Sequence, residues 1–182
     1  MEIRRLDKNE YAGREITVRY TTSGYLDISP CDGGFALRRM SLAEPMQKSF
    51  TDTLFSDWLE APLAYGAFEG EKLLGIAEGS PESWNNRWRI SNICIFEESD
   101  RQRGVGSALM ERLMAEARRS GARMAVLETQ SCNESAVAFY KKHGFEVIGF
   151  DLFAYTNDDP TRHEVRIEMG KKLRRDSGRL LL

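Results

Sequence analysis

Hydrophobic and polar residues alternate along several short stretches of the chain, which is the pattern of half-buried β-strands. The first run covers residues 16–20 (Ile-Thr-Val-Arg-Tyr), and a short strand is expected at 35–40, after a loop predicted over 24–34. Two more strands fall within 63–79, where the turn sequence Glu-Gly-Glu-Lys at 69–72 joins them into a hairpin.

The strand expected at 88–96 carries an irregularity. Its hydrophobic residues are Ile90, Ile93 and Ile95, so the alternation slips by one residue between Ile90 and Ile93. An extra residue in one strand of a pair forms a β-bulge and produces this kind of slip. We therefore expect a bulge within this strand.

Hydrophobic residues at helical spacing predict three helices. The first covers residues 46–59, the second ends at Gly121, and the third begins at Asn133 and ends at Gly144, in agreement with the usual helix-capping residues. The hydrophobic positions spaced four apart are Met46, Phe50, Leu54 and Trp58 in the first helix, and Val105, Leu109, Leu113 and Ala117 in the second.

The order of these elements predicts the fold class. A nearly continuous hydrophobic run at 123–127 indicates a strand buried on both faces, and further strands are expected at 145–155 and 165–169. With a strand–helix–strand unit around 90–128, the chain is predicted to be a mixed α/β protein. We expect one domain over residues 1–172, followed by a charged tail over residues 173–182.

Composition and charge narrow the class of protein. The chain has 182 residues, of which 41% are hydrophobic and 30% charged, as in soluble globular proteins. Lys and Arg number 26 against 28 Asp and Glu, and this net charge of -2 argues against a dedicated nucleic-acid-binding protein. There is no apolar run of about 18 residues and no apolar segment near the N-terminus, so we expect neither a membrane span nor a secretory signal.

The cysteine and histidine content argues against a metal centre. Cys31, Cys94 and Cys132 are odd in number and lack C-x-x-C spacing, so they predict neither a disulfide framework nor a zinc site. The histidines are His143 and His163, too few for a histidine-rich metal site. We expect no metal, and a reducing, cytoplasmic location.

A glycine-rich turn (Arg101-Gln102-Arg103-Gly104-Val105-Gly106) lies between a strand and a helix. Glycines let backbone N–H groups approach a ligand closely, and the start of the helix adds unpaired donors and a positive dipole end. With Arg101 and Arg103 as added charge, such a turn can hold a pyrophosphate. A strand–helix turn without a ligand explains the glycines equally well, since the sequence is neither a Walker A loop nor a complete Rossmann motif.

Two further motifs carry a family resemblance. An N-x-x-A-x-x-F-Y sequence (Asn133, Ala136, Phe139 and Tyr140) lies C-terminal to the glycine-rich turn, and the pair Gly144-Phe145 comes after that sequence. In order and spacing this resembles the GNAT superfamily of acyl-CoA N-acetyltransferases, clearly over about residues 63–169. The resemblance implies a central, mixed but mostly antiparallel sheet of about six to seven strands, splayed between strands 88–96 and 123–129, with helices on both faces.

The same resemblance implies acetyl-CoA as the cosubstrate and assigns residues to it. The pantetheine arm would enter the wedge between the splayed strands, and the pyrophosphate would rest on the glycine-rich turn. The cofactor-binding residues implied in this way are Ile93, Cys94, Ile95, Arg101, Gln102, Arg103, Gly104, Val105, Gly106, Ser107, Ala108, Asn133, Ala136 and Tyr140.

Amine acetylation needs a deprotonated amine, a hydrogen-bond donor for the oxyanion and an acid for the leaving thiolate. The resemblance favours Tyr140 as the acid, because a phenol of ordinary pKa about 10 keeps its proton at pH 7. Packing of Tyr140 in the core is the alternative. The backbone N–H of Cys94 or Ile95 would serve the oxyanion, and the Cys94 thiol is expected to be structural.

The base is open. Many relatives carry an acidic residue on the bulged strand, where this chain has Ser91 and Asn92. Glu128 stands at the end of a buried strand, where ligands bind in open parallel sheets, and is the catalytic candidate. A solvated Glu128 without a catalytic role is equally consistent with its position.

Longer phrases (SWNN, LETQ and GFEVIGFDLFAYTNDD) look like the streptothricin acetyltransferases, which acetylate a β-lysine amine of a cationic antibiotic. A polycation is held by aromatic and acidic groups. The resemblance implies an acceptor site formed by Trp84, Asn85, Glu128, Asp158 and Asp159, with Glu78 and Asp151 also available.

The partner expected from this resemblance is a small-molecule amine, with no nucleic acid and no membrane. A protein N-terminus or a polyamine as acceptor, or a non-catalytic CoA-binding sensor, are the alternatives. The oligomeric state is open, with a homodimer as one alternative.

Overall fold

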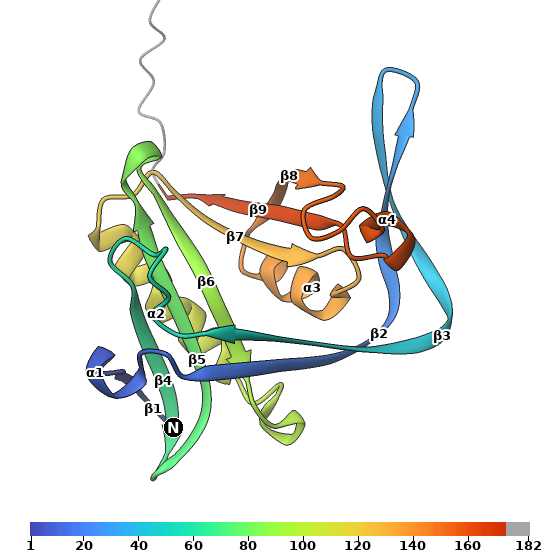
Figure 1. Cartoon of the computed structure of the whole chain (residues 1–182). Helices are drawn as coiled ribbons and strands as arrows, with labels where there is room; N and C mark the ends of the chain where they lie inside the picture. Colours follow the sequence, from blue (N-terminus) through green and yellow to red (C-terminus); the bar gives the residue numbers. More distant parts are fainter. Residues whose placement is uncertain (174–182) are drawn as a thin grey trace, which may run out of the picture. The chain divides into compact units, whose positions relative to one another are not determined.

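The computed structural model describes residues 1–173 (Figure 1). The charged tail predicted over residues 173–182 lies outside the described residues, except for Leu173. The chain divides into two compact units, each discontinuous in sequence. The first unit contains Met1–Val18, Thr51–Val126 and the segment that begins at Lys171, and the second contains Arg19–Phe50 and Leu127–Gly170.

The described residues form nine strands, four α-helices and two short 3-10 helices. The strands are β1 (Glu2–Arg5), β2 (Glu15–Cys31), β3 (Gly34–Thr53), β4 (Leu63–Glu69), β5 (Lys72–Glu82), β6 (Arg87–Ile95), β7 (Met124–Gln130), β8 (Glu146–Asp151) and β9 (Arg166–Lys172). The helices are α1 (Lys8–Tyr11), α2 (Val105–Arg119), α3 (Glu134–Lys142) and α4 (Asp159–Arg162), with η1 (Ser83–Asn85) and η2 (Glu98–Asp100).

Seven strands form one sheet in the order β1-β4-β5-β6-β7-β9-β8, while β2 and β3 form a separate two-stranded sheet. The neighbours β1–β4, β4–β5, β5–β6 and β8–β9 are antiparallel, and β6–β7 are parallel. The predicted mixed α/β fold is therefore confirmed. The hairpin expected at 63–79 is β4–β5, and the expected strand–helix–strand unit is β6–α2–β7.

In the first unit, α2 is held against the sheet by its buried hydrophobic side chains. Its four predicted hydrophobic positions are all buried, and the helix packs against β4, β5 and β6. Gly121 follows the helix with φ +75°, a backbone conformation that glycine adopts without strain, and so ends it as predicted. A separate hydrophobic cluster of the same unit is formed by Leu6, Ile16, Leu54, Phe55, Ala64, Ile76 and Cys94.

The helix predicted over 46–59 is wrong, since β3 continues to Thr53 and no helix follows within this range. A spacing of four residues is also a multiple of the strand period of two, so it fits both structures. The proposed hydrophobic face is not a buried one either: Phe50 and Trp58 are exposed, and only Leu54 is fully buried.

The loop predicted over 24–34 is also wrong. β2 runs through to Cys31, and a turn with Gly33 at φ +77° connects it to β3. Pairing of β2 with β3 satisfies backbone groups that the local sequence did not assign to a strand. In the second unit, α3 begins and ends near the predicted residues, but the strand expected over 145–155 is shorter, and the following loop contains the single turn α4.

Candidate functional site

The predicted bulge in β6 is present. In the pairing of β5 with β6, Glu78 faces Asn92 and Gly79 faces Ile90, so Ser91 is the extra residue. The parallel pairing of β6 with β7 ends at Arg89–Val126, just before the bulge. Both features belong to the first unit.

A buried carboxylate holds this bulge. The Glu78 side chain on β5 is fully buried, and its Oε1 accepts a hydrogen bond from the Phe55 backbone N–H at 2.5 Å. Its Oε2 accepts from Ser91 Oγ at 2.7 Å and from Asn92 Nδ2 at 3.1 Å. Glu78, which the sequence offered as an additional acidic group for a cationic acceptor, therefore bonds the side chains of both Ser91 and Asn92 at the bulge.

The glycine-rich turn has a geometry suited to an anion. Gln102 and Gly104 adopt positive φ angles of 62° and 85°, and Gly104 is the N-cap of α2. Gly104 has no side chain to cap the helix, and a Cβ placed on it would meet no atom within 4 Å. The first helical bond at this end joins Ala108 N–H to Gly104 C=O, so the N–H groups of Val105 and Gly106 precede the first bond of the helix.

Charged side chains fix this turn to the β4–β5 hairpin. Asp100 is buried and accepts hydrogen bonds from Lys72 at 2.9 Å and Arg103 at 2.5 Å, and Arg103 also pairs with Glu69 at 2.6 Å. The hydrogen bond from Lys72, together with the contacts from Arg103, outweighs burial and lowers the pKa of Asp100. Arg103 is thus already matched by two carboxylates, which gives it a structural role in the turn.

The residues predicted to line the pantetheine arm lie on β6 after the bulge. Cys94 is buried, and burial raises the pKa of its thiol to about 11 against the opposing charge of Arg101. The thiol therefore keeps its proton at pH 7 and is not a nucleophile there. A Cβ on Gly75 would lie 2.5 Å from the Cys94 carbonyl oxygen, so glycine allows β5 and β6 to approach closely.

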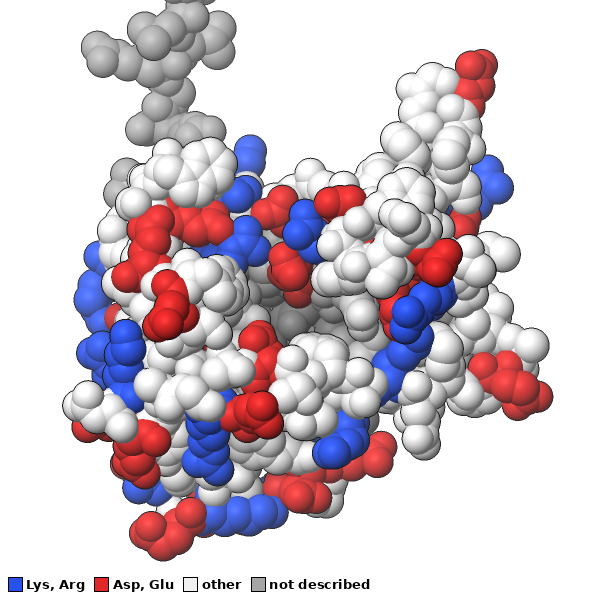
Figure 2. Space-filling view, viewed as in Figure 1, with Lys and Arg blue, Asp and Glu red and all other residues white. Residues whose placement is uncertain are grey.

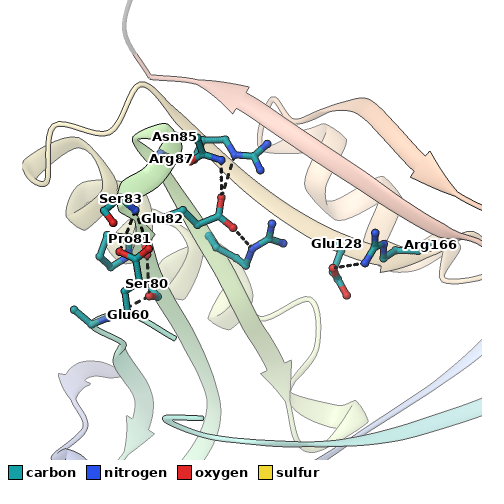
Figure 3. Close-up of polar contacts among 11 residues, drawn as sticks. Glu60, Ser80, Pro81, Glu82, Ser83, Asn85, Arg87, Glu128 and Arg166 are labelled. Carbon is teal, nitrogen blue, oxygen red and sulfur yellow. Dashed lines mark hydrogen bonds and ion pairs between the residues drawn. The ribbon is translucent and has the colours of Figure 1, made fainter. Parts of the chain in front are cut away.

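Trp84 and Asn85 lie in η1, at the turn between β5 and β6. Figure 3 shows the contacts of Asn85 and its neighbours Glu82 and Arg87 in this turn. Glu82 binds Arg87 at 3.0 Å and Arg89 at 2.5 Å, and accepts from Asn85 Nδ2 at 3.3 Å. Burial opposes ionisation of Glu82, but the contact from Arg89 and the other donors outweigh it and lower the pKa.

The two residues of this predicted pair differ in what they expose. Asn85 also accepts the Arg87 N–H through Oδ1, so both ends of its side chain are used within the turn. The Trp84 side chain is 80% exposed, and the Arg87 guanidinium lies 5.8 Å from its ring centroid. Trp84 is therefore the member of the pair that offers a surface to a ligand.

In the second unit, Asn133 and Tyr140 lie at the start and near the end of α3. Asn133 is the N-cap, and its Oδ1 accepts from Ala136 N–H at 3.2 Å and from Ser135 Oγ at 3.1 Å. Tyr140 is buried, with its ring 6.2 Å from that of Phe145 and tilted by 60°. The motif thus combines helix capping with aromatic packing, and places both predicted residues on one short helix.

The predicted acidic residues of the second unit have different environments. Glu128 is exposed and lies 3.8 Å from Arg166, which also lies 3.4 Å from Asp151 (Figure 3 shows the Glu128–Arg166 contact). Asp158 is exposed at the N-terminus of α4.

Asp159, one of the residues expected to form the acceptor site, is fully buried. It accepts hydrogen bonds from the backbone N–H groups of Tyr155 and Thr156 and from the Thr156 hydroxyl, at 2.7 to 2.9 Å. Burial raises the pKa of Asp159, but these donors outweigh it and the net shift is downward. Its carboxylate therefore holds the loop together.

Sequence reasoning missed the roles of Glu78 and of the Lys72–Asp100 pair. A signal for Glu78 was present, because it is a charged residue inside the otherwise apolar run Leu73–Gly79. A carboxylate in such a strand needs buried donors, but the sequence does not say which residues supply them.

The surface offers no single-sign region on the face seen in Figure 2, where acidic and basic side chains are mixed. Among residues 1–173, no three His, Cys, Asp or Glu side chains gather as a metal-binding group. Over the same residues, no helix is both long and apolar enough to cross a membrane.

Comparison with known families gives one match, to the acetyltransferase (GNAT) family, over residues 35–145. Among characterised proteins, the streptothricin acetyltransferase of Streptomyces lavendulae is 32% identical over 146 residues, which are 75% of this chain and 76% of that protein.

Solved structures agree with this match. A nourseothricin acetyltransferase has a TM-score of 0.76 at 25% identity, covering 94% of this chain and 97% of its own. A Bacillus anthracis protein with a provisional assignment as a streptothricin acetyltransferase, determined with acetyl coenzyme A, has a TM-score of 0.71 at 23% identity; the match covers 94% of this chain and 98% of that one. At 23% identity, the similarity to the Bacillus anthracis protein shows a shared fold.

Proposed function

The chain belongs to the GNAT family of acetyltransferases and is an acetyl-CoA-dependent N-acetyltransferase, and we propose that its acceptor is a primary amine of a cationic small molecule, with streptothricin as the first to test. The observation that carries this proposal is the 32% identity to a streptothricin acetyltransferase over three quarters of the chain.

The cofactor part of the proposal uses the turn and the start of α2. The pyrophosphate would bind the first-turn N–H groups of Val105, Gly106 and Ser107, in the open space next to Gly104. The family motif adds the pantetheine arm along Ile93 to Ile95 and a contact from Asn133. Support for the Asn133 contact comes from its cap, which uses Oδ1 and leaves the amide nitrogen of the side chain as a donor.

The reaction requires an acid for the leaving thiolate and a hydrogen-bond donor for the oxyanion. Tyr140 would donate its phenolic proton to the thiolate that leaves when the thioester C–S bond breaks. The backbone N–H of Cys94 or Ile95 would stabilise the oxyanion of the tetrahedral intermediate. The buried, protonated Cys94 thiol has no step in this scheme.

For the acceptor, a cation needs aromatic and acidic surfaces. Trp84 is widely exposed, and Glu128 and Asp158 are exposed carboxylates. We therefore propose Trp84, Glu128 and Asp158 as acceptor-binding groups, with Asn85 and Asp159 holding the turn and the loop that carry two of them.

The test is thiol release from acetyl-CoA by the purified protein, with streptothricin and a panel of polyamines and peptide N-termini as acceptors. Streptothricin-dependent thiol release, a product heavier by one acetyl group, and streptothricin resistance in a sensitive bacterium expressing the gene are the expected results. Turnover with another amine alone would overturn the acceptor. Binding of acetyl-CoA without thiol release for any amine would instead favour the CoA-binding sensor. A homodimer stays a prediction, to be tested by light scattering.

A further inference from the structure

We propose that Glu78 on β5 and Ser91 on β6 together accept the proton that the acceptor amine loses. This inference rests on the proposed function, because it concerns the amine of the same reaction. Its basis is the placement of the Glu78 carboxylate on β5 against Ser91 and Asn92, the two residues at the bulge of β6.

The Glu78 carboxylate accepts every hydrogen bond that it makes. The backbone N–H of Phe55 and the Nδ2 group of Asn92 can only donate, and each points to one oxygen of the carboxylate. Ser91 Oγ is the third partner, at 2.7 Å from Oε2. The carboxylate is therefore held with its lone pairs directed at three donors.

No cation neutralises this carboxylate. Within the part of the chain that the structure describes, Glu78 takes part in no ion pair with Lys, Arg or His. The three hydrogen-bond donors to the Glu78 carboxylate are all neutral groups. The contrast is Glu116, a carboxylate of the same unit that bonds Arg112 and Arg119.

Ser91 links the buried Glu78 carboxylate to a partly solvent-exposed position on β6. Glu78 is fully buried, so it cannot touch an acceptor directly, but Ser91 is the extra residue of the bulge and is only half-buried. A hydroxyl both accepts and donates, and can therefore pass a proton between an amine and a carboxylate.

The proton balance of the step is complete. The ammonium group of the acceptor gives a proton to Ser91 Oγ as the Ser91 hydroxyl proton moves to Glu78 Oε2. The freed lone pair of the amine attacks the thioester carbon. As the C–S bond breaks, Tyr140 gives its phenolic proton to the leaving thiolate, and the second proton that the nitrogen loses on becoming an amide restores the Tyr140 phenol. Glu78 returns its proton to solvent through Ser91 after the product leaves, so the reaction releases one proton overall.

The experiment compares Glu78→Gln and Ser91→Ala with the wild type, measuring thiol release with acetyl-CoA and streptothricin from pH 6 to above pH 9. An amine of pKa about 10 is almost fully protonated at pH 7. Loss of the base should therefore lower kcat/KM for the amine by about 10²- to 10⁴-fold at pH 7 and by much less at the alkaline end. The KM for acetyl-CoA should stay within about twofold, since neither change touches the glycine-rich turn.

Two control variants separate a catalytic role of Glu78 and Ser91 from a purely structural one. Glu116→Gln changes a buried carboxylate of the same unit to an amide, and Ser80→Ala removes a buried hydroxyl from β5 that bonds a backbone carbonyl. Each should change thermal stability without changing the shape of the pH profile. Ser91→Ala keeps the test decisive if Glu78→Gln does not fold.

The outcomes are distinguishable. A wild type that acetylates another amine but not streptothricin overturns the acceptor proposal, and the same comparison is then made with that amine. A wild type that is active, with variants that lose activity equally at every pH or that keep wild-type activity at pH 7, overturns the role of Glu78 and Ser91.

Discussion

Replacing Gly104 with alanine tests the proposed pyrophosphate site with the smallest change that the chain allows. Gly104 has φ +85° and is the N-cap of α2. A residue with a side chain in this conformation costs about 1 to 2 kcal/mol. For a chain of this size we expect the melting temperature to fall by about 2 to 8 °C.

The expected effect of Gly104→Ala on acetyl-CoA binding comes from the bulk of the added methyl group. A Cβ on Gly104 meets no protein atom within 4 Å, so the methyl group itself is not opposed by the folded chain. If a phosphate occupies that space, the methyl group displaces it and lengthens its hydrogen bonds to the first turn of α2. A hydrogen bond to a charged group contributes about 1.5 to 3 kcal/mol, so loss of one should raise the Kd for acetyl-CoA by about 10- to 150-fold.

A matched control is Gly13→Ala. Gly13 has φ +78° in the same unit and also has open space around the position of a Cβ, but it follows α1 and has no proposed role. The two variants should lose similar stability in thermal melts. In calorimetric titration with acetyl-CoA, only Gly104→Ala should bind more weakly, and Gly104→Glu or Gly106→Glu should abolish binding by adding bulk and negative charge. If Gly104→Ala binds acetyl-CoA as tightly as Gly13→Ala does, the pyrophosphate does not lie at this turn.

Three further changes test other parts of the site. Tyr140→Phe should keep the Kd for acetyl-CoA and lower kcat by roughly 10- to 10⁴-fold, measured by thiol release; a near-normal kcat would limit Tyr140 to packing. Glu128→Gln should raise the KM for the cationic acceptor with little change in kcat, whereas a lower kcat with a flattened rise toward high pH would make Glu128 the base in place of Glu78. Contact with Lys72 lowers the pKa of Asp100, so its contribution to stability is complete above the unfolded pKa of about 3.9 and is lost as the pH falls through the lower folded value. The difference in melting temperature between the wild type and Asp100→Asn should therefore be largest near neutral pH and shrink progressively as the pH falls below about 3.9, and a difference independent of pH would contradict this reasoning.

Where local chemistry decides the structure, the sequence was a sufficient guide. The turn at 69–72 and the capping residues of α2 and α3 act over a few residues, so the β4–β5 hairpin and both helices could be predicted. The bulge could be predicted as well, because an extra residue shifts the hydrophobic alternation of β6 at Ser91.

Where residues far apart in the sequence determine the structure, reasoning from local sequence patterns failed. The run from 46 to 59 fits a helix or a strand by its spacing, and pairing of β3 with β2 selects the strand. Asp159 sits in a polar sequence, yet it is buried because the loop folds around its carboxylate.

The chemistry of the site divides in the same way. The glycines and the Asn133 and Tyr140 motif can be read from the chain, because a phosphate turn and a helix cap need particular residue types at fixed spacing. The environment of Glu78 cannot be read in this way, since its three donors come from a turn at Phe55 and from β6, and only the folding of β5 against them brings the four groups together. A residue's type is set by the sequence, but its burial and its hydrogen-bond partners depend on segments far away along the chain, which only tertiary structure brings into contact.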